Sequence, residues 1–400
     1  MARSTGSSFE RLSSSGRAPA SRVYLDYGGF SPVDPRVVAV MRPFLEGGVG
    51  NPSSPHSLGV EARASLDGAR AKLGRLIGGA ASGVIFTAGA TEANNLAIRG
   101  VATRATGRHV VTSAVEHVSI VNACRHLEKR GFEVTWLPVD DLGRVDPGSV
   151  EGAIRPETAL VSVMAANGEI GTVQAIREIG RITRERRVPF HVDGVNAIGR
   201  VPLNVDDAGI DLLTISSNDL CGPPGAGALW MRAETKLAPL ILGGGQEGGY
   251  RSGTENLPAI VGMGVAADLA RAERSTDAAR LVELRDRLLD GLVTRVPRAR
   301  RTGPTGPERL PHHASVVVSG IKADSVLMEL DLRGVVASSG SACSALTGEP
   351  SHVLRAIGCD RAESEGSLCF TLGRWTTAAE IDVVLDAVPA AVGRLQRLAP

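Results

Sequence analysis

One stretch, residues 211–227 with the sequence DLLTISSNDLCGPPGAG, most constrains what this 400-residue chain can fold into. The apolar run 212–215 predicts a buried strand, which Ser216 and Ser217 follow before a turn rich in glycine and proline. In proteins that alternate strands and helices, small polar residues at the carboxyl end of a strand usually mark a ligand site. The stretch therefore predicts an α/β fold with a ligand site beside Ser216.

The composition agrees with a large α/β protein. With 43% apolar residues the chain can bury a large core, and strand–helix alternation over residues 84–231 predicts a mostly parallel sheet covered on both faces. The net charge of +1 and the lack of a bilayer-length apolar run lead us to expect no nucleic-acid partner and no membrane. Five scattered cysteines predict a reduced, cytoplasmic setting rather than a disulfide framework.

We expect three parts along the chain. Residues 1–21, rich in Ser, Gly, Arg and Ala, predict a disordered tail, for which a transit peptide is the alternative. Residues 22–270 predict a large domain, and residues 271–400 a small C-terminal α+β domain onto which the N-terminal segment can also pack. The elements expected in and before the small domain are a helix over 257–295, strands at 315–319, 335–337 and 367–371, and helices near 323–332 and 377–397.

Three further candidate ligand sites follow other predicted strands. The strand 84–86 leads into a turn of small residues and a helix start at Ala90 and Thr91, where free backbone N–H groups can bind phosphate. Spacing alone leaves close packing without a ligand open as the alternative. His117 and Asp193 also come at strand ends. On the residues alone we favour a hydrogen-bonded structural role for His117, and for Asp193 a helix cap is the alternative to a ligand contact.

Several long motifs, in order over residues 22–398, resemble those of the NifS/IscS-type cysteine desulfurases, which are class V pyridoxal-phosphate enzymes of fold type I. The matching segments are GNPSSPHS at 50–57, ATEANN at 90–95, NGEIG at 167–171, GGGQE at 243–247, RSGT at 251–254, SSGSAC at 338–343 and SHVLR at 351–355. The resemblance implies an aspartate-aminotransferase-like fold: a large domain with a mostly parallel seven-stranded sheet, and a small C-terminal α+β domain. It also implies a homodimer with composite sites.

The resemblance further implies which residues would hold pyridoxal 5'-phosphate. Thr254 would reach the phosphate in the partner subunit's site, His117 would stack on the ring, and Asp193 would pair with the ring nitrogen. The full set of implied cofactor contacts is Ala90, Thr91, His117, Asn167, Asp193, Asn196, Ser216, Asn218 and Thr254.

The chain departs from the family pattern at three positions. Where the family has Ser-x-His-Lys, this sequence has Asn218 and Asp219, and a carboxylate cannot form the Schiff base that the lysine forms. Cys369 stands where the family has the arginine that binds the substrate's α-carboxylate. The Asn-Asp form resembles an archaeal IscS-like branch that carries Asp in place of the lysine. Only four lysines occur in the chain, so few amines could replace the missing one.

Cys343 is the residue that the resemblance implies would accept sulfur as a persulfide, and it is also a candidate ligand of an iron–sulfur cluster. With Asp219 it forms the candidate catalytic pair. We favour a desulfurase-like role in sulfur transfer and iron–sulfur cluster assembly beside an IscU-like scaffold protein, with desulfurase activity weakened or lost. Two alternatives stay open: a working desulfurase of L-cysteine, and another reaction of pyridoxal or pyridoxamine phosphate. We expect pyridoxal phosphate to be held non-covalently, with pyridoxamine phosphate or no cofactor as the alternatives.

Overall fold

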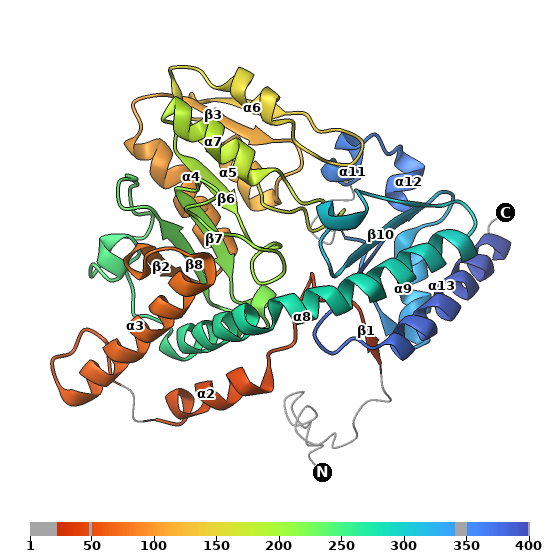
Figure 1. The fold of residues 1–400 in the computed structure, drawn as a ribbon, viewed down its shortest axis with the longest axis horizontal. Coiled ribbons are helices and arrows are strands. Elements are labelled where there is room, and N and C mark those ends of the chain that lie inside the picture. The colour runs from red at the N-terminus through yellow and green to blue at the C-terminus, as the bar shows by residue number, and fades with distance from the viewer. Residues whose placement is uncertain (1–21, 48–49, 341–349, 399–400) are drawn as a thin grey trace, which may run out of the picture.

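A seven-stranded sheet forms the centre of the larger part of the protein in the computed structural model, which describes residues 22–47, 50–340 and 350–398 (Figure 1). The strand order is β2-β8-β7-β6-β5-β3-β4, and β8 runs antiparallel to both of its neighbours while the other pairs are parallel. The predicted mostly parallel seven-stranded sheet is therefore confirmed. The strands are β2 (Val84–Thr87), β3 (His109–Ser113), β4 (Glu133–Leu137), β5 (Thr158–Ser162), β6 (Phe190–Asp193), β7 (Leu212–Ser216) and β8 (Gly227–Met231).

Helices cover both faces of this sheet, because successive side chains of a strand point to opposite sides. Val111 and Leu213 belong to one core cluster, whereas their neighbours Val110 and Leu212 belong to another. The first cluster is completed by α3 (Ser57–Ile77), α7 (Ile176–Arg186) and the first half of α8 (Leu257–Arg295), and the second by α4 (Ala90–Arg104) and α5 (Val118–Glu128). The residues Leu66, Ala69, Leu73 and Ile77 lie on the buried face of α3, and their spacing of three or four positions is the pattern that predicts a helix with one buried face.

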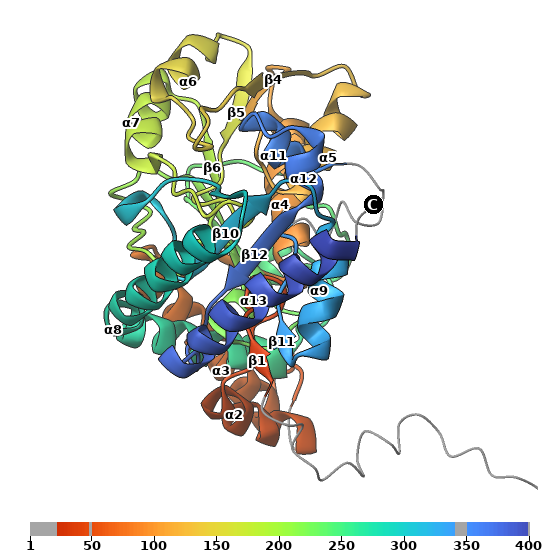
Figure 2. The same cartoon turned by 90° about the vertical axis from the view of Figure 1, so that its right-hand side faces the viewer.

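The smaller part of the protein contains two further sheets. One is antiparallel, with the order β12-β10-β9, and the other pairs β1 in parallel with β11. Figure 2 shows α9 and α13 lying over these strands. The elements are β1 (Val23–Tyr24), β9 (Ala299–Arg301), β10 (His313–Val318), β11 (Val335–Val336), β12 (Ser367–Thr371), α9 (Ala323–Leu332), α11 (His352–Ala356), α12 (Arg361–Glu365) and α13 (Ala378–Leu398). The predicted strands and helices of this region are thus present.

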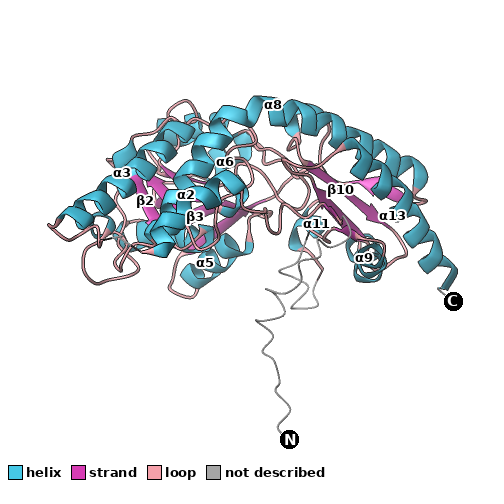
Figure 3. Cartoon of the chain, turned by 90° about the horizontal axis from the view of Figure 1, so that it is seen from below, coloured by secondary structure: helices cyan, strands magenta, loops and turns pink. Residues whose placement is uncertain are grey.

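The 39-residue helix α8 links the two parts (Figure 3). Its residues from Leu257 to Ala270 lie in the core of the large part, and those from Leu281 to Leu292 lie in the core of the small part. Val23, which precedes the large part in sequence, also lies in the second core. The division that we propose between residues 270 and 271 thus falls inside a continuous helix. Among the described helices, none combines the length and the apolar character needed to cross a membrane.

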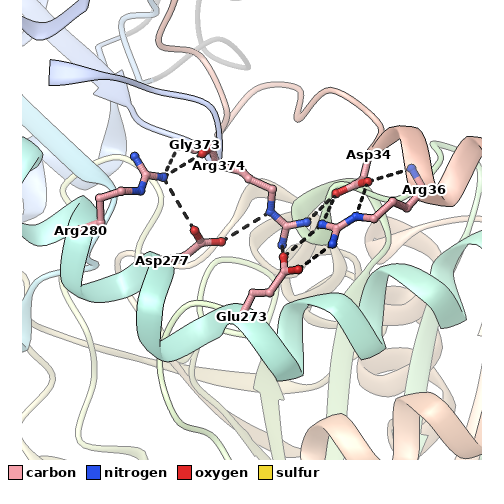
Figure 4. A network of polar contacts seen from close by, with 7 residues as sticks. All are labelled: Asp34, Arg36, Glu273, Asp277, Arg280, Gly373 and Arg374. Carbon is pink, nitrogen blue, oxygen red and sulfur yellow. Dashed lines mark hydrogen bonds and ion pairs between the residues drawn. The ribbon is translucent and has the colours of Figure 1, made fainter. Parts of the chain in front are cut away.

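A network of ion pairs fastens the two parts together near the start of α2 (Pro35–Glu46) (Figure 4). Arg374, in the connection between β12 and α13, lies 2.5 Å from Asp34 and 2.9 Å from Glu273 of α8. Arg36 contacts the same two carboxylates, at 2.8 Å and 2.6 Å. The Asp34 side chain is only 3% exposed and also caps α2, as its position before Pro35 predicts. Segments far apart in sequence therefore meet at one buried carboxylate.

This network is expected to make folding stability depend on acidity. Hydrogen bonds from Arg36, supported by Arg374, hold the pKa of Asp34 far below its usual value of about 4. A carboxyl group with a lowered pKa in the folded state stabilises the protein above its unfolded pKa, and this contribution is lost as the pH falls through the folded pKa. We therefore expect wild-type stability to fall more steeply below about pH 4 than that of Asp34→Asn, which keeps the helix cap.

The measurement is the midpoint of urea unfolding at a series of pH values from neutral to acidic. The control is Asp382→Asn, which removes an exposed carboxylate paired with Arg287. Its pH profile should follow that of the wild type. Parallel profiles for wild type and Asp34→Asn would show that the network makes no net contribution.

Candidate functional site

A cavity of about 850 Å³ lies where the carboxyl ends of the parallel strands meet the smaller part of the protein. This is the position at which α/β proteins bind ligands. The predicted residues that line it are Ala90, Thr91, His117, Asn167, Asp193, Asn196, Ser216, Asn218 and Asp219, joined by Cys369 of β12. Thr254 lies exposed on a loop and is not part of this cavity. Cys343 lies outside the described residues.

The start of α4 offers free backbone donors to the cavity. Gly89 precedes the helix, and no side chain caps its first turn. The carboxylate of Glu92 is turned away to accept from the backbone N–H of Ala88 and to pair with Arg251 at 3.0 Å. The close approach of β8 requires glycine at 227, since a Cβ there would lie 2.6 Å from the Gly89 carbonyl carbon. The N–H groups of Ala90 and Thr91 can therefore receive a phosphate.

Asp193 ends β6 as a buried and fixed carboxylate. Its Oδ2 accepts a 2.8 Å hydrogen bond from the amide of Asn94, and its Oδ1 accepts a 3.1 Å bond from the N–H of Val195. His117 lines the same cavity and caps α5, because its Nδ1 accepts from the backbone N–H of Ser119 at 3.2 Å. Both the structural and the ligand-facing interpretations of His117 are compatible with this position.

Two predicted asparagines use part of their amide groups within the protein. Asn167 donates to the carbonyl of Val115 at 2.8 Å and accepts from the N–H groups of Glu169 and Ile170. This holds the loop after β5 in place, so Asn167 shapes the cavity wall. Asn218 accepts from the N–H of Ser31 at 3.2 Å through its Oδ1, which leaves its amide nitrogen as a donor for a ligand.

Asp219 lies in the short 3-10 turn η2 (Asn218–Leu220) and is paired with Arg200. The Arg200 guanidinium approaches its Oδ1 at 3.4 Å, and the two side chains are 12% and 8% exposed. Burial raises the pKa of Asp219, and the charge of Arg200 opposes that rise. At this point the cavity therefore presents a carboxylate that is paired with an arginine.

Arg200 is a site residue that the sequence analysis missed. A signal for it was present, because a buried carboxylate needs a cation and Arg200 is the single basic residue between β6 and β7. The two partners are 19 positions apart in the sequence, so no local spacing pattern predicts this pairing.

Cys369 of β12 lines the same cavity with a thiol. It is 2% exposed, and burial raises its pKa to about 12. Its Sγ lies 3.3 Å from Nε2 of His313, which also lies 2.9 Å from the carbonyl oxygen of Gly168. A thiol is either neutral or anionic, so Cys369 offers no positive charge to a ligand carboxylate.

These residues fit the phosphate and the ring of pyridoxal phosphate, but not its covalent attachment. The uncapped start of α4 suits the phosphate, and the fixed carboxylate of Asp193 suits a protonated ring nitrogen. No lysine is among the described residues that line the cavity. The residues that line the cavity can therefore hold the cofactor non-covalently.

Comparisons with known proteins show the family to which the chain belongs. The aminotransferase class-V family matches residues 23–384. The chain is 47% identical over 380 residues to a protein of Archaeoglobus fulgidus named cysteine desulfurase IscS 1, which covers 94% of this chain and 98% of the relative. It is 44% identical over 380 residues to cysteine desulfurase IscS of Dictyoglomus turgidum, covering 94% and 96%. A solved NifS-like protein superposes with a TM-score of 0.88 at 33% identity, covering 94% of this chain and 100% of that one.

Proposed function

Because the chain belongs to the aminotransferase class-V family and, within it, to the NifS/IscS-type cysteine desulfurases, we propose that it is a desulfurase-like protein of iron–sulfur cluster assembly and sulfur transfer. Its activity on L-cysteine is weakened or lost. The observation that carries this proposal is the pairing of Asp219 with Arg200 at 3.4 Å, at the position that the sequence resemblance assigns to the family's lysine. An arginine stays protonated and cannot replace the missing amine.

The cavity residues would bind and orient the cofactor but would not attach it covalently. The N–H groups of Ala90 and Thr91, with Ser216 and Asn218, would hold the phosphate, and the Asp193 carboxylate would pair with the ring nitrogen; all of these residues line the cavity. When bound, pyridoxal phosphate supplies an electron sink for bonds at the substrate's α-carbon. Asp219 can accept a proton there but provides no nucleophilic nitrogen. Pyridoxamine phosphate, which needs no such lysine, and an empty cavity are the alternatives for the cofactor.

Sulfur transfer is assigned to Cys343. In the sequence it is surrounded by serine, alanine and glycine, as is the persulfide cysteine of the family that the segment resembles. Thiolates also bind iron in clusters, so Cys343 can share a cluster with an IscU-like scaffold protein. Free sulfide then enters the cluster directly as its bridging sulfide, whereas a persulfide on Cys343 would form only by transfer of sulfur from L-cysteine. We place this activity in the cytoplasm and in a homodimer, in which Thr254 reaches the partner subunit's site.

A working cysteine desulfurase is the second candidate. It is favoured by the names of the relatives and by the cavity that retains the residues implied to hold the cofactor. Such an enzyme would convert L-cysteine to L-alanine and leave sulfur on Cys343.

Alanine formation from L-cysteine separates the two candidates. We expect the protein, supplied with pyridoxal phosphate and L-cysteine, to form alanine no faster than the same cofactor without protein. The reason is that neither Asp219 nor Cys369 supplies the group that its position requires. The control is an equal concentration of the heat-denatured protein. Many turnovers per chain at a rate well above this control would establish the desulfurase instead.

A further inference from the structure

A second, smaller cavity lies where the middle of α8 meets the loop before β10 and the loop after β12. Its volume is about 60 Å³, which is room for roughly four water molecules at about 15 Å³ each. Asp219 lines both this second cavity and the cavity of the candidate site, whereas Arg200 lines the second cavity and not the first. The Asp219 side chain therefore lies between the two cavities, with its partner Arg200 on the side of the smaller one.

Arg200 presents unused hydrogen-bond donors to the second cavity. Of its guanidinium nitrogens, only Nη1 is engaged, at 3.4 Å from Oδ1 of Asp219 and 3.4 Å from the carbonyl oxygen of Asn196. Both contacts are longer than the roughly 2.7–3.2 Å of an ordinary N–H···O bond. Its Nε and Nη2 make no hydrogen bond with a described residue, yet neither is buried beyond the reach of a water molecule. Arg200 can therefore bind a further acceptor without giving up an existing strong contact.

Arg274 brings another cation to the second cavity. It lies on the face of α8 that lines this cavity, since Ala270, Ala278 and Leu281 line it too and recur at helical spacing. The Arg274 side chain is half-buried, and no carboxylate of the described chain lies within 4.0 Å of its guanidinium. Its positive charge is thus not compensated by a neighbouring side chain.

The other charges around the second cavity balance one another. Arg200 and Asp219 form one pair. The network described above contributes equal numbers of both signs, as Figure 4 shows: the carboxylates of Asp34, Glu273 and Asp277, and the guanidinium groups of Arg36, Arg280 and Arg374. Among the groups with no such partner, Arg274 therefore leaves an excess positive charge.

The remaining ionisable groups that line the second cavity are neutral at neutral pH. Burial lowers the pKa of His312 well below its usual value, and the charge of Arg200 adds to this effect. Burial also raises the pKa of the Cys221 thiol, and it raises the pKa of Tyr27 to about 12. None of these side chains supplies the negative charge that would compensate Arg274.

We propose that the second cavity binds a small monovalent anion, with Arg200 and Arg274 as its hydrogen-bond donors. Guanidinium groups make strong, charge-assisted hydrogen bonds to anions, and a cavity with an excess of positive charge attracts them. The volume admits an ion of the size of chloride or formate and excludes a nucleotide or a sugar acid. The site is separate from the proposed cofactor contacts and does not involve Cys343.

An anion in this site competes with Asp219 for the charge of Arg200. By reciprocity, removing the negative charge of Asp219 must strengthen anion binding as much as a bound anion favours the uncharged form of Asp219. Because Asp219 also lines the cavity of the candidate site, occupancy of the second cavity is transmitted there through this one side chain.

Thermal unfolding at constant ionic strength tests the site, because an anion that binds only the folded chain raises the unfolding midpoint. Sodium chloride or sodium formate replaces sodium gluconate in separate titrations, since gluconate is too large for the cavity. We expect the midpoint to rise and then saturate with each small anion, and the lower half-saturating concentration identifies the preferred one. Arg200→Gln and Arg274→Gln should each weaken this binding at least about tenfold. The control Arg287→Gln, at an exposed pair with Asp382, should not.

Asp219→Asn tests the competition for Arg200. It removes the charge that repels the anion and frees the guanidinium, so the half-saturating concentration should fall about tenfold. The matched control Asp382→Asn removes an exposed carboxylate and should leave that concentration unchanged. A half-saturating concentration that stays the same in Asp219→Asn would contradict the competition.

Equal midpoints in chloride, formate and gluconate would overturn the proposal, as would unchanged anion binding in both arginine variants. Crystals of the wild type soaked in bromide give a readout that needs no variant to fold. We expect an anomalous peak in the second cavity, and bromide bound only elsewhere would also overturn the proposal. None of these measurements depends on cysteine turnover or on Cys343, so this site and the proposed function can fail separately.

Discussion

Replacing Asp219 with lysine is expected to attach pyridoxal phosphate covalently to the chain, whereas the wild type holds it without a bond. The proposed cofactor contacts Asp193, Ser216 and Asn218 line the same cavity as Asp219. The measurement is the intact mass after borohydride reduction in the presence of the cofactor. Asp219→Lys should gain the mass of one reduced cofactor per chain, and the wild type should gain none.

Arg200 is expected to increase the reactivity of the lysine amine in Asp219→Lys towards the cofactor. In the wild type its guanidinium neutralises Asp219, and in the variant it would lie beside a second cation. A neighbouring positive charge lowers the pKa of a lysine and so increases the neutral, nucleophilic fraction of its amine. The control Asp219→Asn removes the charge without adding an amine and should gain no mass. A wild-type protein found with the cofactor bonded to Lys236 would contradict this assignment.

Turnover of L-cysteine should remain poor in Asp219→Lys until Cys369→Arg is added. The lysine supplies the amine, but the thiol at 369 still leaves the substrate's carboxylate without a cation. A charge-assisted contact of this kind contributes about 2–4 kcal/mol, so the double variant should exceed the single one by roughly thirtyfold or more. Full activity in the single variant would show that position 369 does not bind the carboxylate.

Local patterns were enough to predict most of the fold. The apolar runs of the parallel strands are buried on both faces, and this produces the alternation of Val110 and Val111 between two cores. The spacing of Leu66 and Leu73 likewise placed one face of α3 correctly. Such features depend on neighbours within one element, which is the information that a sequence pattern contains.

Contacts between distant segments could not be predicted in the same way. The pairing of Arg200 with Asp219, and the meeting of Asp34 with Arg374 across 340 residues, depend on how whole elements pack. Contacts within the candidate site could not be predicted from local patterns either. Nine residues predicted from the motifs line one cavity, but the motifs did not indicate that the amide of Asn167 would hold the cavity wall.

Substitution of Cys343 is expected to cause the largest loss of function of any single substitution. Cys343→Ala is expected to leave folding and dimerisation intact, with a change in unfolding free energy within about 0.5 kcal/mol, because its serine- and glycine-rich segment is typical of a surface loop. It should abolish the transfer of persulfide, or the shared ligation of a cluster, because no other residue of the segment carries a thiol. The matched control is Ser344→Ala, which changes the adjacent residue and keeps the thiol.

Cluster assembly on an IscU-like scaffold, with iron and sulfide supplied, tests the central claim most directly. The rate of cluster formation is followed by absorbance with wild type, Cys343→Ala or Ser344→Ala present. We predict acceleration by wild type and Ser344→Ala, a rate with Cys343→Ala equal to that of the scaffold alone, and a complex trapped through Cys343. Equal rates with all three proteins, and no such complex, would contradict a role in iron–sulfur cluster assembly.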